Sequence, residues 1–197
     1  MPSKKVAEVV AEEAQADPGV PVEAFATDEH RLGLKPVVRS VWAPVGVRPV
    51  AHGHHRFEWL YATIFDPPAA GERFWYISNG VSKPFFEALL ATFAEEAGAG
   101  RERRIVLVLD NTGWYGETNL KVPDGVRRLF LPRYTPELQP AEHLWEVVDD
   151  PIINKHISDL ETLDAIVSER CAGLASDRQN RKGCTGFHWR SNIANAC

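Results

Sequence analysis

Three acidic residues, Asp28, Asp110 and Glu142, are the strongest candidates for chemistry in this sequence. Asp28 and Asp110 each stand at the carboxyl end of a segment with the pattern of a buried strand, and open α/β sheets bind their ligands at that end of the strands. If the three carboxylates converge, their oxygens can hold two Mg²⁺ ions that activate a water or a sugar hydroxyl and stabilise the leaving oxygen of a phosphodiester.

Each acid also has a purely structural explanation. Aspartate is a frequent turn residue at strand ends, and a glutamate in the first turn of a helix answers the positive end of the helix dipole. Glu142 follows Leu138 by four residues and precedes Trp145 by three, so helical spacing predicts a carboxylate on the apolar side of a helix that begins at Pro140. The same spacing predicts that Trp145 belongs to the core.

The segments around these acids predict a mixed sheet covered by helices. Residues 105–109 form a continuous apolar run, which is typical of a strand covered on both faces. Antiparallel strands followed by alternating strands and helices favour an α/β protein with a mixed five-stranded sheet flanked by helices. We expect strands over 22–28, 57–65, 73–78, 105–109 and 126–131, and helices over 6–16, 84–97, 140–149 and 160–174.

Composition limits the class of protein. The chain has 197 residues, of which 44% are hydrophobic and 25% charged, values that argue against disorder and fibrous repeats. No apolar run reaches membrane-spanning length and no signal-like segment opens the chain, so we expect a cytoplasmic protein without a membrane partner.

The three cysteines are too few and too clustered to form a disulfide scaffold, and we expect free thiols. A zinc site at Cys171, Cys184 and His188 lacks both a CxxC pair and an evident fourth ligand.

The formal net charge of −5 is unevenly distributed. Acidic residues dominate the first 30 positions, whereas basic residues gather in 101–133 and 177–190. These local basic segments could meet phosphate groups, because electrostatic steering depends on where the charges lie.

Residues 131–145 read LPRYTPELQPAEHLW and closely resemble the LPPYSPELNPxExxW signature of the DDE endonuclease domain in bacterial insertion-sequence transposases of the six-thirty family, relatives of the mariner transposons. Residues 26–34 (ATDEHRLGL) are similar to the first-aspartate block of that family, and residues 106–111 (VLVLDN) to the second. With further landmarks, the resemblance extends over roughly residues 22–190.

The resemblance implies a ribonuclease-H-like fold in which Asp28, Asp110 and Glu142 are the catalytic metal ligands, with two Mg²⁺ or Mn²⁺ ions as cofactors. It implies metal-dependent DNA cleavage at transposon ends, transfer of the freed 3′ hydroxyl to target DNA, and a homodimer on DNA at the nucleoid. Two alternatives stay open: an inactive or repurposed DNA- or protein-binding remnant, and a stand-alone nuclease without strand transfer.

Transposases of this type begin with helix-turn-helix modules, whereas here only about twenty residues precede the first catalytic strand. We therefore expect a helical appendage at 1–20, the catalytic domain at 21–175 and a basic tail at 176–197. DNA recognition would then come from a separate helix-turn-helix polypeptide or from an upstream reading frame; the alternative is a truncated gene.

Candidate DNA contacts lie around the second and third acidic residues. Tyr115 stands where the family usually carries a histidine, and arginines flank the strands expected there; as a set the candidates are Arg104, Arg127, Arg128, Arg133 and Tyr115. Such arginines orient DNA through its phosphates without reading its sequence. The alternative is that they only solvate an edge of the fold.

Overall fold

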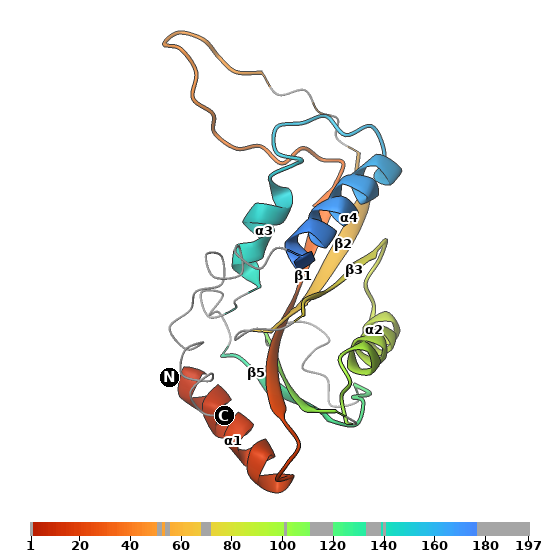
Figure 1. The fold of residues 1–197 in the computed structure, drawn as a ribbon. Helices are drawn as coiled ribbons and strands as arrows, with labels where there is room; N and C mark the ends of the chain where they lie inside the picture. The colour runs from red at the N-terminus through yellow and green to blue at the C-terminus, as the bar shows by residue number, and fades with distance from the viewer. Residues whose placement is uncertain are drawn as a thin grey trace.

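The computed structural model describes residues 2–50, 53, 56–67, 72–100, 102–110, 120–132, 139 and 141–176. These residues form a mixed five-stranded sheet with helices on both faces (Figure 1). In chain order the elements are α1 (Pro2–Ala16), β1 (Val22–Gly33), β2 (Trp59–Asp66), β3 (Phe74–Ser78), α2 (Lys83–Glu96), β4 (Arg104–Leu109), β5 (Val126–Phe130), α3 (Glu142–Asp149) and α4 (Leu160–Ser176). The α/β class and the mixed sheet expected from the sequence are confirmed.

The strand order is β3-β2-β1-β4-β5. β1 runs parallel to β4, and β4 runs parallel to β5, whereas β1 pairs antiparallel with β2, and β2 with β3. β1 therefore separates an antiparallel half of the sheet from a parallel half.

β1 is longer than its sequence pattern indicates. Its parallel pairing with β4 ends at Ala26↔Val108, but its antiparallel pairing with β2 continues as far as Gly33↔Trp59. Asp28 consequently lies inside β1, at the point where this strand loses its β4 partner. The expectation that the strand ends at Asp28 is wrong, because β2 satisfies the backbone of the charged residues that follow.

The face covered by α2 is rich in aromatic residues. Phe93 of α2 stacks on Phe65 with ring centroids 3.9 Å apart, and it meets Phe25 edge-on at 5.1 Å. The helix begins where the sequence predicts, because the Ser82 hydroxyl accepts a hydrogen bond from the Phe85 amide at 3.3 Å and Pro84 occupies its first turn.

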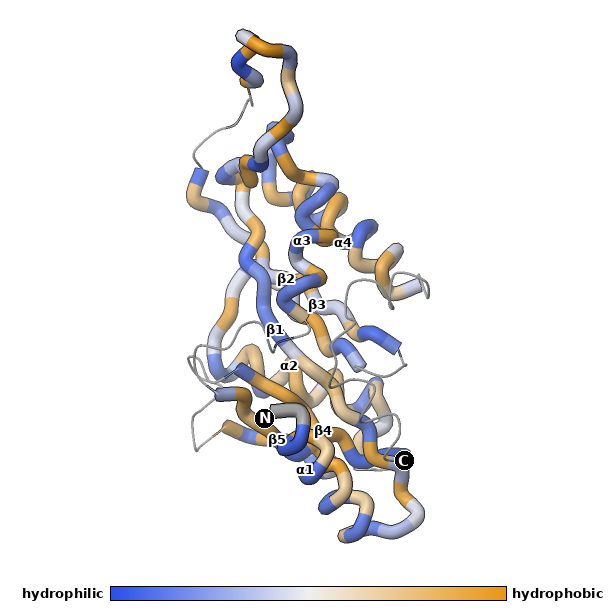
Figure 2. The backbone as a smooth tube through the Cα atoms, turned by 90° about the vertical axis from the view of Figure 1, so that its left-hand side faces the viewer, coloured by the Kyte–Doolittle hydropathy of each residue, from blue (hydrophilic) through white to orange (hydrophobic). Residues whose placement is uncertain are grey.

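The opposite face carries α1, α3 and α4. Val6, Val9 and Val10 of α1 are buried in one cluster with Val106 and Val108 of β4, among other residues, and Figure 2 shows α1 beside β4 and β5. The first helix thus contributes to the core instead of lying on the surface alone. α3 and α4 share a second cluster with alternate residues of β1 and β2.

Residues 35–50 contain no helix or strand and extend away from the sheet (Figure 1). Trp42 and Val45 are fully exposed in this segment. Of the described residues, none belongs to a helix that is both long and apolar enough to cross a membrane. The expected basic tail after residue 176 lies outside the described residues.

Candidate active site

Asp28 lies in β1, and Asp110 directly follows the last residue of β4, the adjacent parallel strand. The β1–β4 register joins Val22 to Arg104 and Ala26 to Val108, and the same offset places Asp28 beside Asp110, just beyond the last pair. Side chains alternate along a strand, so Asp28 projects from the same face as Ala26, the face that carries α3. The sequence expectation that these two acids meet at one end of the parallel strands is consistent with this register.

The electrostatics link Asp28 to both other acids. Burial raises the pKa of the Asp28 carboxyl to about 6, and the negative charges of Asp110 and Glu142 act in the same direction. Hydrogen bonds from the Trp145 side chain and the Glu29 backbone lower this pKa and offset part of the rise. An additional positive charge at this position would stabilise the ionised carboxylate.

Glu142 does not face the core. It is the first residue of α3 and its side chain is exposed, whereas the buried residues of the helix are Leu144, Trp145, Val148 and Asp149. The expectation of a core-facing carboxylate is therefore wrong: the helix begins at Glu142, two residues later than predicted, and its buried stripe passes through Trp145 and Asp149. Leu138, on which the expectation partly rested, lies outside the described residues.

The carboxylates of the candidate site suit a hard divalent cation, but the structure does not bring all three together as a metal site. Asp28 and Asp110 offer carboxylate oxygens, the ligands that Mg²⁺ prefers. Burial, and to a smaller extent nearby negative charges, raise the pKa of Asp28, and a bound cation would offset both effects. Within the described ranges, however, no group of three His, Cys, Asp or Glu side chains is arranged to hold a metal ion. The two aspartates thus offer ligands that suit such an ion, and Glu142 is exposed at the start of α3.

The cysteines form no such set in the described part of the chain. Cys171 is a free, buried thiol of α4, and its burial raises the thiol pKa to about 12. The other two members of the weighed zinc site, Cys184 and His188, lie outside the described residues.

Two residues of the 131–145 segment contact the first-aspartate strand, which the sequence reading missed. Trp145 Nε1 donates a hydrogen bond to Asp28 Oδ2 at 2.7 Å, and Gln139 Nε2 donates to the Thr27 carbonyl at 2.9 Å. Trp145 is also buried, as expected, with 7% of its surface exposed. Trp145 and Glu142 belong to one sequence motif, and this is the only sequence signal that could have suggested the bond between Trp145 and Asp28.

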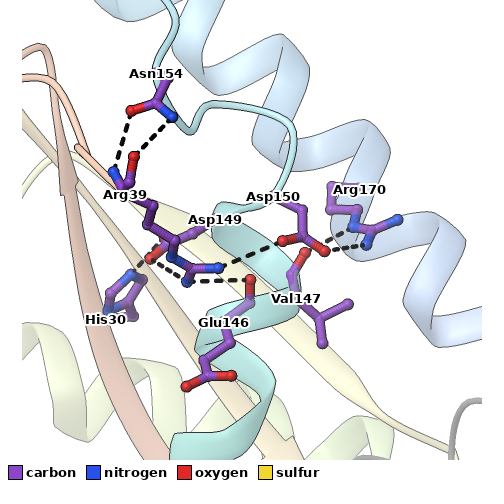
Figure 3. Close-up of polar contacts among 8 residues, drawn as sticks. All are labelled: His30, Arg39, Glu146, Val147, Asp149, Asp150, Asn154 and Arg170. Atoms are coloured by element: carbon purple, nitrogen blue, oxygen red, sulfur yellow. Dashed lines mark hydrogen bonds and ion pairs between the residues drawn. The ribbon is translucent and has the colours of Figure 1, made fainter. Parts of the chain in front are cut away.

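A network of polar side chains holds the C-terminal end of α3 (Figure 3). His30 Nε2 lies 2.9 Å from Asp149 Oδ1, and Arg39 approaches the other oxygen of that carboxylate to 3.9 Å. Arg39 also lies 3.6 Å from Asp150, which Arg170 of α4 approaches to the same distance. β1, the segment after it and α4 therefore all fix this helix end, where cations also complement the helix dipole.

The arginines predicted to contact DNA differ in their surroundings. Arg104 bonds Asp17 at 3.1 Å, and Arg127 bonds Glu12 and Glu13 at 2.9 Å each, so carboxylates at α1 and just after it neutralise both. Arg128 instead lies over the ring of Phe130, 5.5 Å from its centroid. All three line a cavity of about 430 Å³ beside β5. Arg133 and Tyr115 lie outside the described residues.

The strand order, with acidic residues where the two central parallel strands separate, defines a ribonuclease-H-like α/β fold. The chain is similar in structure to the pre-cleavage Mos1 transpososome (TM-score 0.66, 12% identity, covering 98% of this chain and 61% of that chain). It is also similar to the Mos1 mariner paired end complex with Mn (0.62, 12%, 99% and 61%) and to the Mos1 strand transfer complex (0.62, 14%, 98% and 60%).

The family described as DDE superfamily endonuclease matches residues 24–164, and the chain belongs to that family. The resemblance and the ribonuclease-H-like fold expected from the sequence are thereby confirmed. A relative from Sinorhizobium fredii, the uncharacterized protein y4pE/y4sA, is 40% identical over 67 residues, which are 34% of this chain and 48% of the relative. The chain spans about half the length of that relative and about 60% of the Mos1 chains.

Proposed function

We propose that this chain is the catalytic domain of a DDE transposase, which hydrolyses DNA at transposon ends and joins the freed 3′ hydroxyl to target DNA. The observation that carries the proposal is the parallel β1–β4 register, which places Asp28 level with Asp110 when it is extended by two residues. Burial and the negative charges of Asp110 and Glu142 raise the pKa of the Asp28 carboxyl. The family match over residues 24–164 supports the same activity.

In this proposal Asp28 and Asp110 hold a divalent ion jointly, and Glu142 completes a second site from the start of α3. When bound, Mg²⁺ or Mn²⁺ ions supply an activated water or hydroxyl and stabilise the leaving oxygen. Asp28 contributes an ionised carboxylate that receives a hydrogen bond from Trp145, and the exposed Glu142 side chain is free of core packing, so it can turn towards the aspartates. Two of the Mos1 complexes with a similar fold are described with Mn and with Mg.

The partner that we propose is DNA, bound as transposon ends and target by two copies of the chain at the nucleoid. The similar structures include a Mos1 paired-end complex with the left transposon end and a Mos1 strand transfer complex, which supports this choice. Arg128, Arg133 and Tyr115 are proposed to contact phosphates, whereas Arg104 and Arg127 contribute only after their ion pairs at the α1 end open.

A supercoiled plasmid carrying the transposon ends tests the activity in the presence of Mg²⁺ or Mn²⁺. Asp110→Asn should abolish nicking and keep the circular dichroism spectrum of the wild type, and Asp164→Asn, an exposed change on α4, should retain full activity. Joined products indicate strand transfer, and nicks alone indicate a stand-alone nuclease. Normal cleavage by Asp110→Asn would overturn the assignment.

A non-catalytic binding remnant is the second candidate, and the outward position of Glu142 favours it. Such a remnant would bind DNA yet show no Mg²⁺ or Mn²⁺ binding that depends on Asp28 and Asp110. Calorimetric titration of the wild type and of Asp28→Asn with Mn²⁺ separates the two candidates without relying on cleavage.

A further inference from the structure

We propose that Trp145 is a positioning residue for the Asp28 carboxylate, and that His30 and Asp149 hold Trp145 in the required place. The inference rests on the proposed function, because it takes Asp28 as a metal ligand. The indole Nε1–H is a hydrogen-bond donor only, so this nitrogen cannot be a ligand of a metal ion. Its role is to fix the direction in which the Asp28 oxygens point.

The bond between the two residues is short and partly buried. Trp145 Nε1 lies 2.7 Å from Asp28 Oδ2, and the indole is almost fully buried in the core that α3 shares with the sheet. A hydrogen bond to a carboxylate is roughly twice as strong as a neutral one, and burial removes competing water. The carboxylate therefore has a fixed orientation before any ion arrives.

His30, two residues after Asp28 on β1, packs against the Trp145 indole. The two rings stack with centroids 4.9 Å apart and planes only 16° from parallel. His30 Nε2 in turn lies 2.9 Å from Asp149 Oδ1, at the last residue of α3 (Figure 3). Trp145 thus cannot rotate away from Asp28 without disturbing a stacked ring that is itself anchored.

The two contacts have nearly the same spacing along α3 as along β1. Trp145 and Asp149 are four residues apart on a helix, a rise of about 6 Å. Asp28 and His30 are two residues apart on a strand, a rise of about 6.7 Å. Two bonds can therefore form side by side, Asp28 with Trp145 and His30 with Asp149, and together they fix the position and the rotation of α3 on β1.

This double attachment matters because α3 has little stability of its own. It has only eight residues, and no side chain caps its N-terminus. Helices this short depend on tertiary contacts. Glu142 lies three residues before Trp145 on the same helix. The contacts that orient Asp28 therefore also fix the backbone position from which the Glu142 side chain extends.

Mn²⁺ binding to the full chain, measured by calorimetry without DNA, tests the inference. Trp145→Phe keeps a flat ring over His30 and removes the Nε1 donor, and we expect its Mn²⁺ affinity to fall about tenfold or more, as for partners that orient metal ligands. Trp75→Phe is the matched control. Trp75 packs edge-on against Trp145 at 5.9 Å, and within the described residues its buried Nε1 has no acceptor, so the affinity should stay within about twofold of wild type.

The indole Nε1–H resonance gives a second readout that packing alone would not move. Mg²⁺ titration of ¹⁵N-labelled protein should shift the Trp145 signal, assigned by its loss in Trp145→Phe. The shift should disappear in Asp28→Asn. A Trp145 signal that ignores Mg²⁺ in a protein that binds the ion would overturn the proposal.

The outcomes separate this inference from the proposed function. If Asp28→Asn binds Mn²⁺ as tightly as wild type, or wild type binds none, the metal assignment of the proposed function fails. If wild type binds and folded Trp145→Phe binds equally well, only the positioning role is overturned. If thermal unfolding shows that Trp145→Phe does not fold, the His30→Ala variant is measured instead. A several-fold weaker Mn²⁺ affinity of His30→Ala supports the positioning role of Trp145, and an unchanged affinity overturns it.

Discussion

Arg73 Nε donates a hydrogen bond to Asp66 Oδ1 at 2.5 Å, and both side chains are almost completely buried. Asp66 ends β2, and Arg73 lies just before β3, so the ion pair joins the two strand ends that flank the hairpin loop. Arg73 also lines a cavity of about 390 Å³ together with Ser168 and Cys171 of α4. The pair therefore ties the antiparallel half of the sheet together beside α4.

Removing one partner of this pair should be strongly destabilising. Asp66→Asn leaves the Arg73 charge buried without a counter-charge, and such losses cost about 3–5 kcal/mol. Urea unfolding followed by tryptophan fluorescence would measure the change, with the exposed Asp124→Asn as control. A loss below about 1 kcal/mol would mean that the pair contributes little to folding.

The raised pKa of Asp28 makes stability depend on pH in a defined direction. The folded Asp28 carboxyl has a pKa of about 6 against its ordinary value of 3.8, so the folded state binds more protons between these values. Stability should therefore be highest below about pH 4 for this group and fall as the pH rises towards 6. At pH 7 the buried charge costs at most about 3 kcal/mol, an order-of-magnitude figure from the size of the shift.

Asp28→Asn should accordingly be more stable than wild type at pH 7 in EDTA, by about 1–3 kcal/mol, because its amide keeps an acceptor for Trp145 without the charge. Urea denaturation between pH 4.5 and 7.5 would show a flatter pH dependence for the variant. A less stable Asp28→Asn protein at pH 7 would contradict the electrostatic explanation.

Local patterns predicted the elements well, because apolar periodicity and proline positions decide them. The run 105–109 and the stripe of α2 are examples: both depend on residues close in sequence, and both lie where expected. The extension of β1 to Gly33 was not predictable in this way, because its charged residues are held by pairing with β2. The Trp145–Asp28 bond likewise joins residues far apart in sequence, and only the packed fold brings them together.

The sequence did not predict the exposed orientation of Glu142, for a related reason. Its orientation depends on the residue at which α3 begins, and helix ends are the least certain feature of a sequence pattern. A start at Glu142 leaves the carboxylate exposed at the helix end while Trp145 and Asp149 face the sheet. Asp110 and Glu142 are among the charges that raise the pKa of Asp28, but the spacing of the three acids in the chain does not specify the direction of the Glu142 side chain.

The acidic residues of α1 should weaken DNA binding by holding Arg127. Replacing Glu12 and Glu13 together with glutamine frees its guanidinium, and one added phosphate contact should steepen the salt dependence of binding by about 0.9 in log–log slope. Fluorescence anisotropy with a labelled duplex at several KCl concentrations would measure this slope.

The control for this experiment is a double variant with the same change in net charge. Glu8→Gln with Glu161→Gln removes two exposed carboxylates for which no ion pair is found in the described part of the chain. If this control steepens the salt dependence as much as the Glu12 and Glu13 variant does, the change in net charge explains the effect, and the release of Arg127 does not.

Glu142 and Glu146 offer the sharpest comparison for the candidate site, because they are the same residue type one turn apart on α3 and both are exposed. Only Glu142 is among the charges that raise the pKa of Asp28. Glu142→Gln should therefore lower the Asp28 pKa, measured by carboxyl NMR titration, and abolish metal-dependent plasmid cleavage. Glu146→Gln should leave both unchanged. If Glu142→Gln cleaves normally, or if both variants lose activity equally, Glu142 has no special place beside the two aspartates.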